Sequence, residues 1–127
     1  MFHYTVETNK GMDEAVQALE AELKNDKFGV LWDFDVKATL NNKGLDFEKP
    51  VRILEVCNPT EAKKVLEKNE LVSYFLPCKI VVHESEGKTK IGMPKPTKLI
   101  EFVEDEELNQ IAQDIEERMI SAINEAK

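Results

Sequence analysis

The sequence predicts an α+β protein in which helices pack on one face of an antiparallel sheet. Apolar residues alternate with other residues from 28 to 40, as on a strand with one buried face. Segments 12–23 and 108–123 repeat apolar residues at helical spacing. Most neighbouring strands are joined by short connections, which favour antiparallel pairing.

The first half begins with a short strand at residues 2–7 and a helix from Met12 that stops near Asn25. The clearest strand follows at residues 28–40, because a strict period of two excludes a helix there. Its even positions are all apolar: Phe28, Val30, Trp32, Phe34, Val36, Ala38 and Leu40.

The second half opens with a third strand, Val51–Cys57. A helix begins directly after it, since Asn58 can cap the free amides and Pro59 suits the first turn. Two further strands, 78–84 and 88–93, are joined by a hairpin turn at 85–87. We expect residues 97–103 to be extended or irregular, and a long amphipathic helix to begin at about Asp105.

Size and charge narrow the classes of function. A chain of 127 residues suits a single domain over residues 1–127, and it can bury a core without a disulfide or a metal. The net charge of −8 disfavours a nucleic-acid partner. The five lysines of residues 79–98 lack arginines and interleaved aromatics, so they are read as a solvated hairpin.

Location is inferred from what the sequence lacks. Residues 1–7 do not resemble a signal peptide, and no apolar run is long enough to span a membrane. Two cysteines are too few for a secreted disulfide scaffold. We therefore expect a cytoplasmic protein with no membrane partner.

A family resemblance appears from the third strand onward. The segments that carry it are Leu54-Glu55-Val56-Cys57-Asn58-Pro59, then Ala62 and Leu66, then Leu76-Pro77-Cys78-Lys79-Ile80-Val81-Val82, and Gly87. Together they resemble the signature of the domain-of-unknown-function 302 family over residues 1 to about 100. The resemblance implies a curved antiparallel sheet of the TATA-binding-protein-like type, β-α-β(4)-α, with an extra helix between strands three and four. It implies no activity, and a fold name does not import DNA binding.

Cys57 and Cys78 are the main candidate functional residues. If strands three and four are antiparallel neighbours, Cys57 leaves one strand where Cys78 enters the other, so both thiols lie at one end of the sheet. Cys57 also precedes a helix N-terminus, which favours a thiolate. Such a pair could handle a soft metal, sulfur or a redox step. The other interpretation is that both are small buried hydrophobes.

Three acids form a second candidate group. Asp33 and Asp35 share the polar side of strand two, and Glu55 is the charge in the middle of strand three. On a common open face they could perform acid–base work or bind a cation, or simply be solvated. His83 has the opposite parity to Cys78, which disfavours a joint metal site, and we assign no metal ligands. No hydrolase or nucleotide-binding motif is present, so no cofactor is indicated and an enzyme is the less favoured class.

The helix-free face of the sheet is expected to be unusually apolar. Leu31, Val51, Ile53, Ile80 or Val81, and Val82 are assigned to it. An exposed apolar patch typically marks an interface or a ligand groove. The sequence thus favours a module that binds a small apolar ligand or a partner, as a homodimer, with thiol-based function through Cys57 and Cys78 as the alternative.

Overall fold

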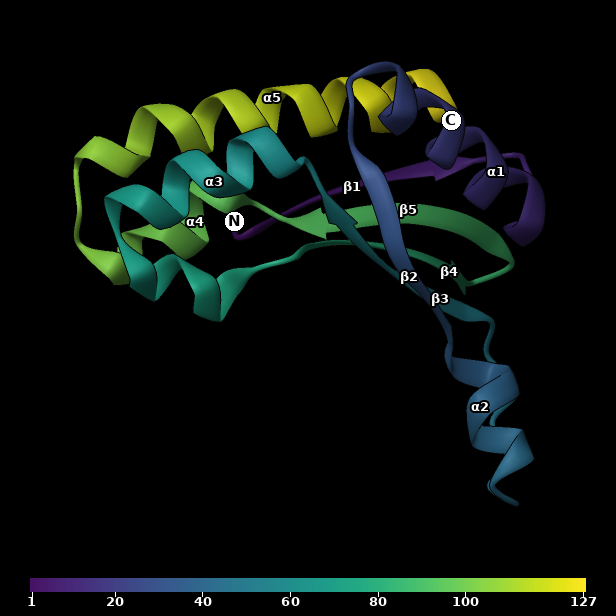
Figure 1. Cartoon of the computed structure of the whole chain (residues 1–127). Helices are drawn as coiled ribbons and strands as arrows, with labels where there is room; N and C mark the ends of the chain where they lie inside the picture. Colours follow the sequence, from purple (N-terminus) through teal and green to yellow (C-terminus); the bar gives the residue numbers. More distant parts are fainter.

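The computed structural model describes all residues from 1 to 127 and is built around a five-stranded antiparallel sheet. The strand order is β1-β5-β4-β3-β2, so β1 and β2 form the two edges (Figure 1). The strands are β1 (His3–Thr8), β2 (Gly29–Asp35), β3 (Val51–Cys57), β4 (Cys78–Ser85) and β5 (Lys88–Pro94). The predicted α+β class with an antiparallel sheet is confirmed.

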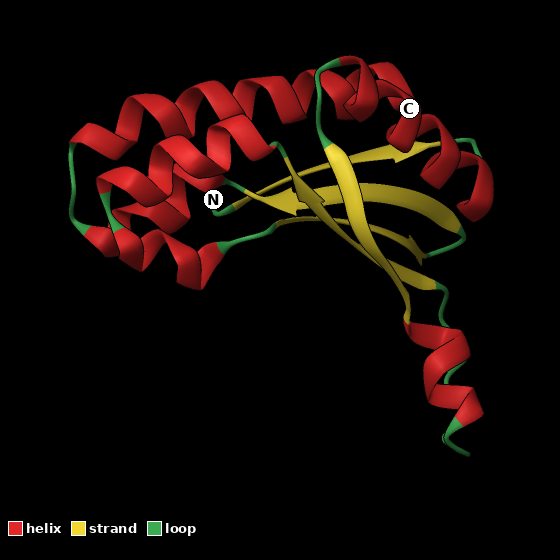
Figure 2. Cartoon of the chain, viewed as in Figure 1, coloured by secondary structure: helices red, strands yellow, loops and turns green.

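Apart from α2, which projects away from the end of β2, the long helices lie on one side of the sheet, as expected (Figure 2). The two long helices, α1 (Met12–Asn25) and α5 (Glu107–Ala126), pack against each other there. The predicted extra helix between strands three and four is α3 (Pro59–Lys68). The shorter elements are α2 (Val36–Asn42), α4 (Pro96–Leu99) and the 3₁₀ helices η1 (Glu70–Phe75) and η2 (Ile100–Val103).

The main core lies between the sheet and the pair α1 and α5. Sixteen buried residues form it, including Leu54 and Val56 of β3 and Ile80 and Val82 of β4. Fully burying side chains of this size contributes about 1.5–3 kcal/mol each. The alternating residues of β3 and β4 therefore fix which side of the sheet faces the helices.

A second, smaller cluster lies beyond the end of the sheet. The N-terminal half of α5 extends past the strands and lies above α3 and α4 (Figure 1). There Leu108 and Ala112 of α5 pack with Val65, Val72 and Ile100. The apolar stripe of α5 therefore contributes side chains to both clusters.

Arg118 fixes α5 against the loop that precedes β2. Its guanidinium donates to the Asp26 carboxylate at 2.8 and 3.2 Å and to the backbone carbonyl of the same residue at 3.3 Å. It also pairs with Glu61 at the start of α3 and lies 5.1 Å from the centroid of the Phe28 ring. Charge-assisted bonds of this kind are stronger than neutral ones, so they hold α5, α3 and β2 in a defined arrangement.

The predicted second strand over residues 28–40 is wrong in its second half. β2 ends at Asp35, and residues 36–42 form helix α2, which extends away from the sheet (Figure 1). The Asp35 carboxylate accepts a hydrogen bond from the backbone N–H of Ala38 at 3.0 Å and caps this helix. The helix cap prevails over the strand-like alternation of apolar residues here, because residues 36–40 have no neighbouring strand to pair with.

The single buried face predicted for this strand is also wrong. A β-bulge lies between Val30 and Trp32, so two residues of β2 oppose one of β3. Val30 packs against the main core, whereas Trp32 is opposite Glu55 on the helix-free side. The extra residue therefore reverses the alternation, so the apolar side chains after the bulge point to the opposite face of the sheet from those before it.

The expectation that residues 97–103 are extended or irregular is likewise wrong, because α4 and η2 occupy them. Pro96 stands at the first position of α4, a helix-start signal that the sequence contains. Ile100 is then buried in the second cluster.

Two matched leucine substitutions test this arrangement. Leu54→Ala in β3 removes a fully buried side chain (0% exposed) and is expected to lower the free energy of unfolding by about 2–5 kcal/mol. Leu31→Ala, at the bulge and 64% exposed, should change it by less than about 0.5 kcal/mol. Urea titration measures both values, and similar losses for the two variants would contradict the assigned faces.

Candidate functional site

The chain between β3 and β4 shapes one end of the sheet. After Cys57, the side chain of Asn58 caps α3 by accepting from the backbone N–H groups of Thr60 and Glu61 at 3.1 and 3.2 Å. Helix α3 leads into η1, which returns the chain to the start of β4 at Cys78. On the opposite side, α4 follows β5 directly and brings η2 under α5. These segments enclose a space at the end of the strands.

That space is an apolar cavity of about 370 Å³. Eleven of its sixteen lining residues are hydrophobic. The lining comprises Glu55, Val65, Val72, Tyr74, Phe75, Leu76, Pro77, Cys78, Lys79, Pro94, Pro96, Leu99, Ile100, Leu108, Ala112 and Ile115. Its volume and composition fall within the range of small-molecule sites in proteins.

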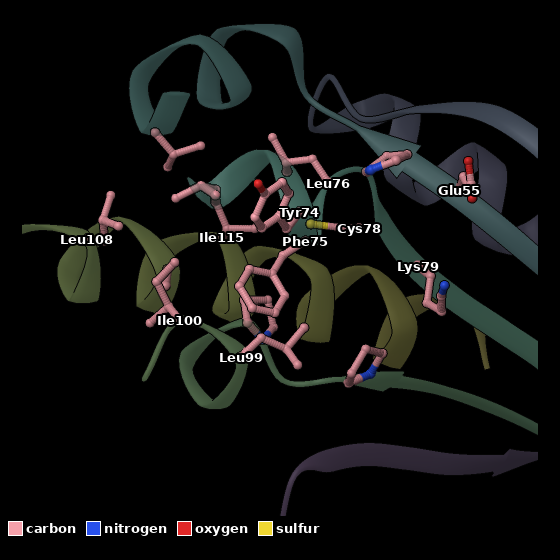
Figure 3. A pocket seen from close by; sticks show the side chains of 16 residues that line it. Glu55, Tyr74, Phe75, Leu76, Cys78, Lys79, Leu99, Ile100, Leu108 and Ile115 are labelled. Atoms are coloured by element: carbon pink, nitrogen blue, oxygen red, sulfur yellow. The ribbon is translucent and has the colours of Figure 1, made fainter. Parts of the chain in front are cut away.

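The two charged residues of the cavity lie at one end. Figure 3 shows Glu55 and Lys79 on the side of the strands, while Ile100 and Leu108 lie at the far end. Glu55 and Lys79 are direct cross-strand partners of β3 and β4, and neither takes part in an ion pair within the protein. The cavity therefore has a charged rim and an apolar interior.

The two cysteines lie where the sequence placed them, at the same end of antiparallel strands. β3 and β4 pair antiparallel with Val56 opposite Cys78, and both cysteines are free thiols. Cys78 lines the 370 Å³ cavity, and its sulfur is visible at the centre of Figure 3. Cys57 does not line that cavity, but both residues line a void of about 20 Å³ beside it.

The environment of these thiols works against a reactive thiolate. Burial raises the pKa of Cys78 to about 11, with a smaller contribution from the nearby Cys57. Burial also raises the pKa of Cys57, although this residue precedes the N-terminus of α3. Removal from water thus outweighs the helix dipole that the sequence analysis invoked.

The three acids do not share one face, contrary to expectation. Asp33 is opposite the buried Leu54, on the helix-covered side. It accepts from the guanidinium of Arg52, through Nε at 2.9 Å and also through Nη2, while Arg52 pairs with Asp13 of α1. Asp35 caps α2, so only Glu55 remains on the open side. The β2 bulge, which reversed the parity, explains the separation.

The helix-free side of the sheet, called the uncovered face below, carries the second half of β2. Trp32 is 52% exposed and stacks on Phe34 with ring centroids 5.0 Å apart. Ile53 lies opposite Phe34 on β3, and Val81 follows on β4. Of the two alternatives Ile80 and Val81 it is therefore Val81 that lies on this side, and the assignment of Val82 is wrong, because Ile80 and Val82 are fully buried in the main core.

Other candidate features are less developed. No group of three or more His, Cys, Asp and Glu side chains is arranged to hold a metal ion. His83 lies opposite Val51, and burial together with the charges of Lys90 and Lys49 lowers its pKa. No helix has both the length and the apolar character required for crossing a membrane.

Sequence reasoning missed most of the residues that line the cavity. They come from β3, α3, η1, β4, β5, α4, η2 and α5, so only the tertiary fold brings them together. Local signals existed in the apolar segment 71–76 and in Pro94 and Pro96, which mark irregular turns near strand ends.

The fold and the cavity define a class of small α+β proteins with a five-stranded open sheet and an apolar site at its end. The family model described as "Domain of unknown function DUF302" matches residues 4–126, and the chain belongs to this family. Membership assigns no activity, because the family is defined by a domain of unknown function.

A solved structure supports the assignment. The chain is 54% identical to the "uncharacterized conserved protein DUF302 from Bacillus stearothermophilus", whose crystal structure is known. The match covers 100% of this chain and 99% of that one, with a TM-score of 0.97. No curated protein matches the chain.

Thiol alkylation provides a test of the cysteine environment. At pH 8, Cys78 is expected to carry roughly a hundredfold less thiolate than a thiol with the usual pKa of 9.0, because its pKa is about 11. Its reaction with iodoacetamide should therefore keep accelerating about tenfold per pH unit between pH 8 and pH 10. Mass spectrometry of the peptides measures each cysteine separately, and a plateau below pH 8 would contradict this environment.

Proposed function

We propose that the protein binds a small, predominantly apolar molecule in the cavity at the end of the sheet. The observation that carries this proposal is a 370 Å³ space with eleven hydrophobic lining residues and a charged rim. Binding sites for small molecules combine these properties: apolar walls supply affinity, and a few polar groups orient the ligand.

The walls of this cavity are held in place by packing elsewhere. Val65, Val72, Ile100 and Leu108 belong to the second cluster, and Ile115 belongs to the main core. Side chains that are packed on both sides resist collapse into a neighbouring space, since protein interiors are close to crystal density. This supports a site that is formed before the ligand arrives, which reduces the entropic cost of binding.

The alternative is thiol-based metal, sulfur or redox handling by Cys57 and Cys78. Their common location at one strand end supports it, but burial raises both pKa values and so suppresses the nucleophilic thiolate. We therefore favour the neutral thiol of Cys78 as part of an apolar wall.

A second proposal concerns a partner: two copies of the chain associate through the uncovered face. The specific observation is the exposed, stacked pair of Trp32 and Phe34 beside Ile53. Exposed apolar and aromatic surface of this kind is typical of interfaces, and self-association around a two-fold axis is the commonest form.

A homologous series of primary alcohols tests the binding function. From hexan-1-ol upward, isothermal titration calorimetry should show Kd falling about fourfold per added methylene, because each buried methylene contributes about 0.8 kcal/mol. The gain should stop once the cavity is full, and the heat-capacity change should be negative. The absence of saturable binding across the series would contradict the proposal.

A charged substitution in the lining provides the matched control. Leu99→Asp places a carboxylate in the cavity wall and is expected to weaken binding of octan-1-ol tenfold or more. Leu71→Asp introduces the same charge on an exposed residue outside the lining and should leave the Kd unchanged. Equal effects of the two variants would place the binding site elsewhere.

Sedimentation velocity tests the dimer. The wild-type chain should sediment as twice its mass of 14.5 kDa, and Trp32→Asp should shift it toward the monomer. Trp32→Phe retains an aromatic surface and should preserve the dimer. Because Trp32 is the single tryptophan, its emission should also shift to shorter wavelength as concentration rises. A wild-type monomer at high concentration would contradict this interface.

A further inference from the structure

We propose that residues 36–50, called the arm below, pack on a second copy of the chain, and that the two copies of a two-fold dimer exchange their arms in this way. This inference rests on the association of two copies proposed above. It goes further by naming the segment that each copy contributes and the side chains that make the contact.

The arm has an ordered local structure. Its helix, α2, ends in a Schellman motif: Gly44 has φ of +80°, and its N–H donates to the carbonyl of Asn41 at 3.0 Å. In the same motif the N–H of Leu45 donates to the carbonyl of Leu40 at 3.0 Å. The Asn41 side chain then holds the returning chain, because its amide donates to the carbonyl of Phe47 at 3.1 Å and accepts from the N–H of Phe47 at 3.2 Å.

This order does not come from burial in the same chain. Helix α2 points away from α1 and α5 (Figure 1), and no residue from 36 to 50 is buried. A helix of fewer than about 12 residues is marginal in water by itself, and α2 has only seven. Most of the stability of such a helix comes from packing of an apolar side against another surface. The surface that stabilises the arm therefore belongs to another molecule.

The arm has an apolar side that such a surface can cover. A Schellman motif typically brings the residue after its glycine into contact with the residue at its start, here Leu45 and Leu40. Val36 lies one turn before Leu40 on the same side of α2. Leu45 is 57% exposed, and Val36 and Leu40 are only partly buried. These three side chains are therefore available to a partner.

The position of the arm identifies that partner as a second copy. Trp32 and Phe34 lie on the uncovered face, and Val36 follows them at the next alternate position, so the aromatic pair leads directly into the arm. The chain thus has two adjoining apolar surfaces. A two-fold dimer buries both at once, because each copy contributes an arm and receives one.

The charge of the arm permits this contact. Two copies with a net charge of −8 each repel one another at long range. The arm is not acidic itself, since it contains three lysines and two acids: Lys37, Lys43 and Lys49, and Asp46 and Glu48. Contact through the arms therefore adds no like-charge repulsion at the interface, and the lysines can pair with acids of the second copy.

Sedimentation velocity on matched variants tests the arm. Leu45→Asp places a carboxylate on its apolar side and should raise the Kd of the dimer tenfold or more. Because Leu45 is exposed in the single chain, this variant should still melt cooperatively. Leu71→Asp makes the same change at an exposed residue of η1, outside the arm and the uncovered face, and should leave the Kd unchanged. Equal Kd values for Leu45→Asp and the wild type overturn the inference.

Hydrogen exchange on the wild type gives a result that needs no variant. The backbone N–H groups of α2 should exchange at least tenfold more slowly in the dimer than after dilution to the monomer, because α2 has no other packing. Those of α5, which packs within one chain, should exchange at the same rate at both concentrations. Exchange of α2 that stays constant while the dimer dissociates overturns the inference.

The two parts of the dimer proposal can fail separately. A dimer that Trp32→Asp disrupts and Leu45→Asp leaves intact overturns the role of the arm alone, and the interface on the uncovered face stands. A wild-type chain that remains a monomer at high concentration refutes both the interface and the exchange of arms.

Discussion

Helix α5 buries one continuous apolar stripe against two different cores, and the elements around the cavity depend on this constraint. The part from Ile115 onward, with Met119 and Ile123, packs on the sheet, whereas Leu108 and Ala112 pack in the second cluster. Twenty helical residues span about 30 Å, but a strand of seven residues spans only about 23 Å. Part of the stripe must therefore extend beyond the sheet and be covered by something else.

The short elements provide that cover. α3, η1 and η2 contribute Val65, Val72 and Ile100 beneath the overhanging part of α5. Arg118, bound to Asp26 and Glu61, ties α5 to α3 and to the segment that precedes β2. The cavity is the space left between two well-packed clusters, which explains why its walls are apolar and its rim, formed by strand ends, is charged.

Whether a feature of the structure could be predicted from the sequence depends on how far apart in the chain the residues that form it are. The Asn58 cap and the hairpin turn predicted at 85–87 are local, and both are present, with Ser85 paired to Lys88. The bulge before Trp32 is not local: it depends on how β2 registers with β3, and one extra residue placed Asp33 with Arg52 and Trp32 on the uncovered face. Cys57 and Cys78 could be placed together from strand direction alone, whereas the cavity gathers residues from eight elements and has no sequence signature.

The same burial explains why the cysteines are better suited to shaping a cavity than to chemistry. A thiolate needs water, a nearby cation or free amides to stabilise its charge, and Cys78 lies instead among Leu76, Ile115 and Val65. These neighbours exclude water and raise the pKa of Cys78 to about 11, which keeps it neutral. A neutral thiol is a small apolar group, so the environment that removes a nucleophile from this site also completes an apolar wall.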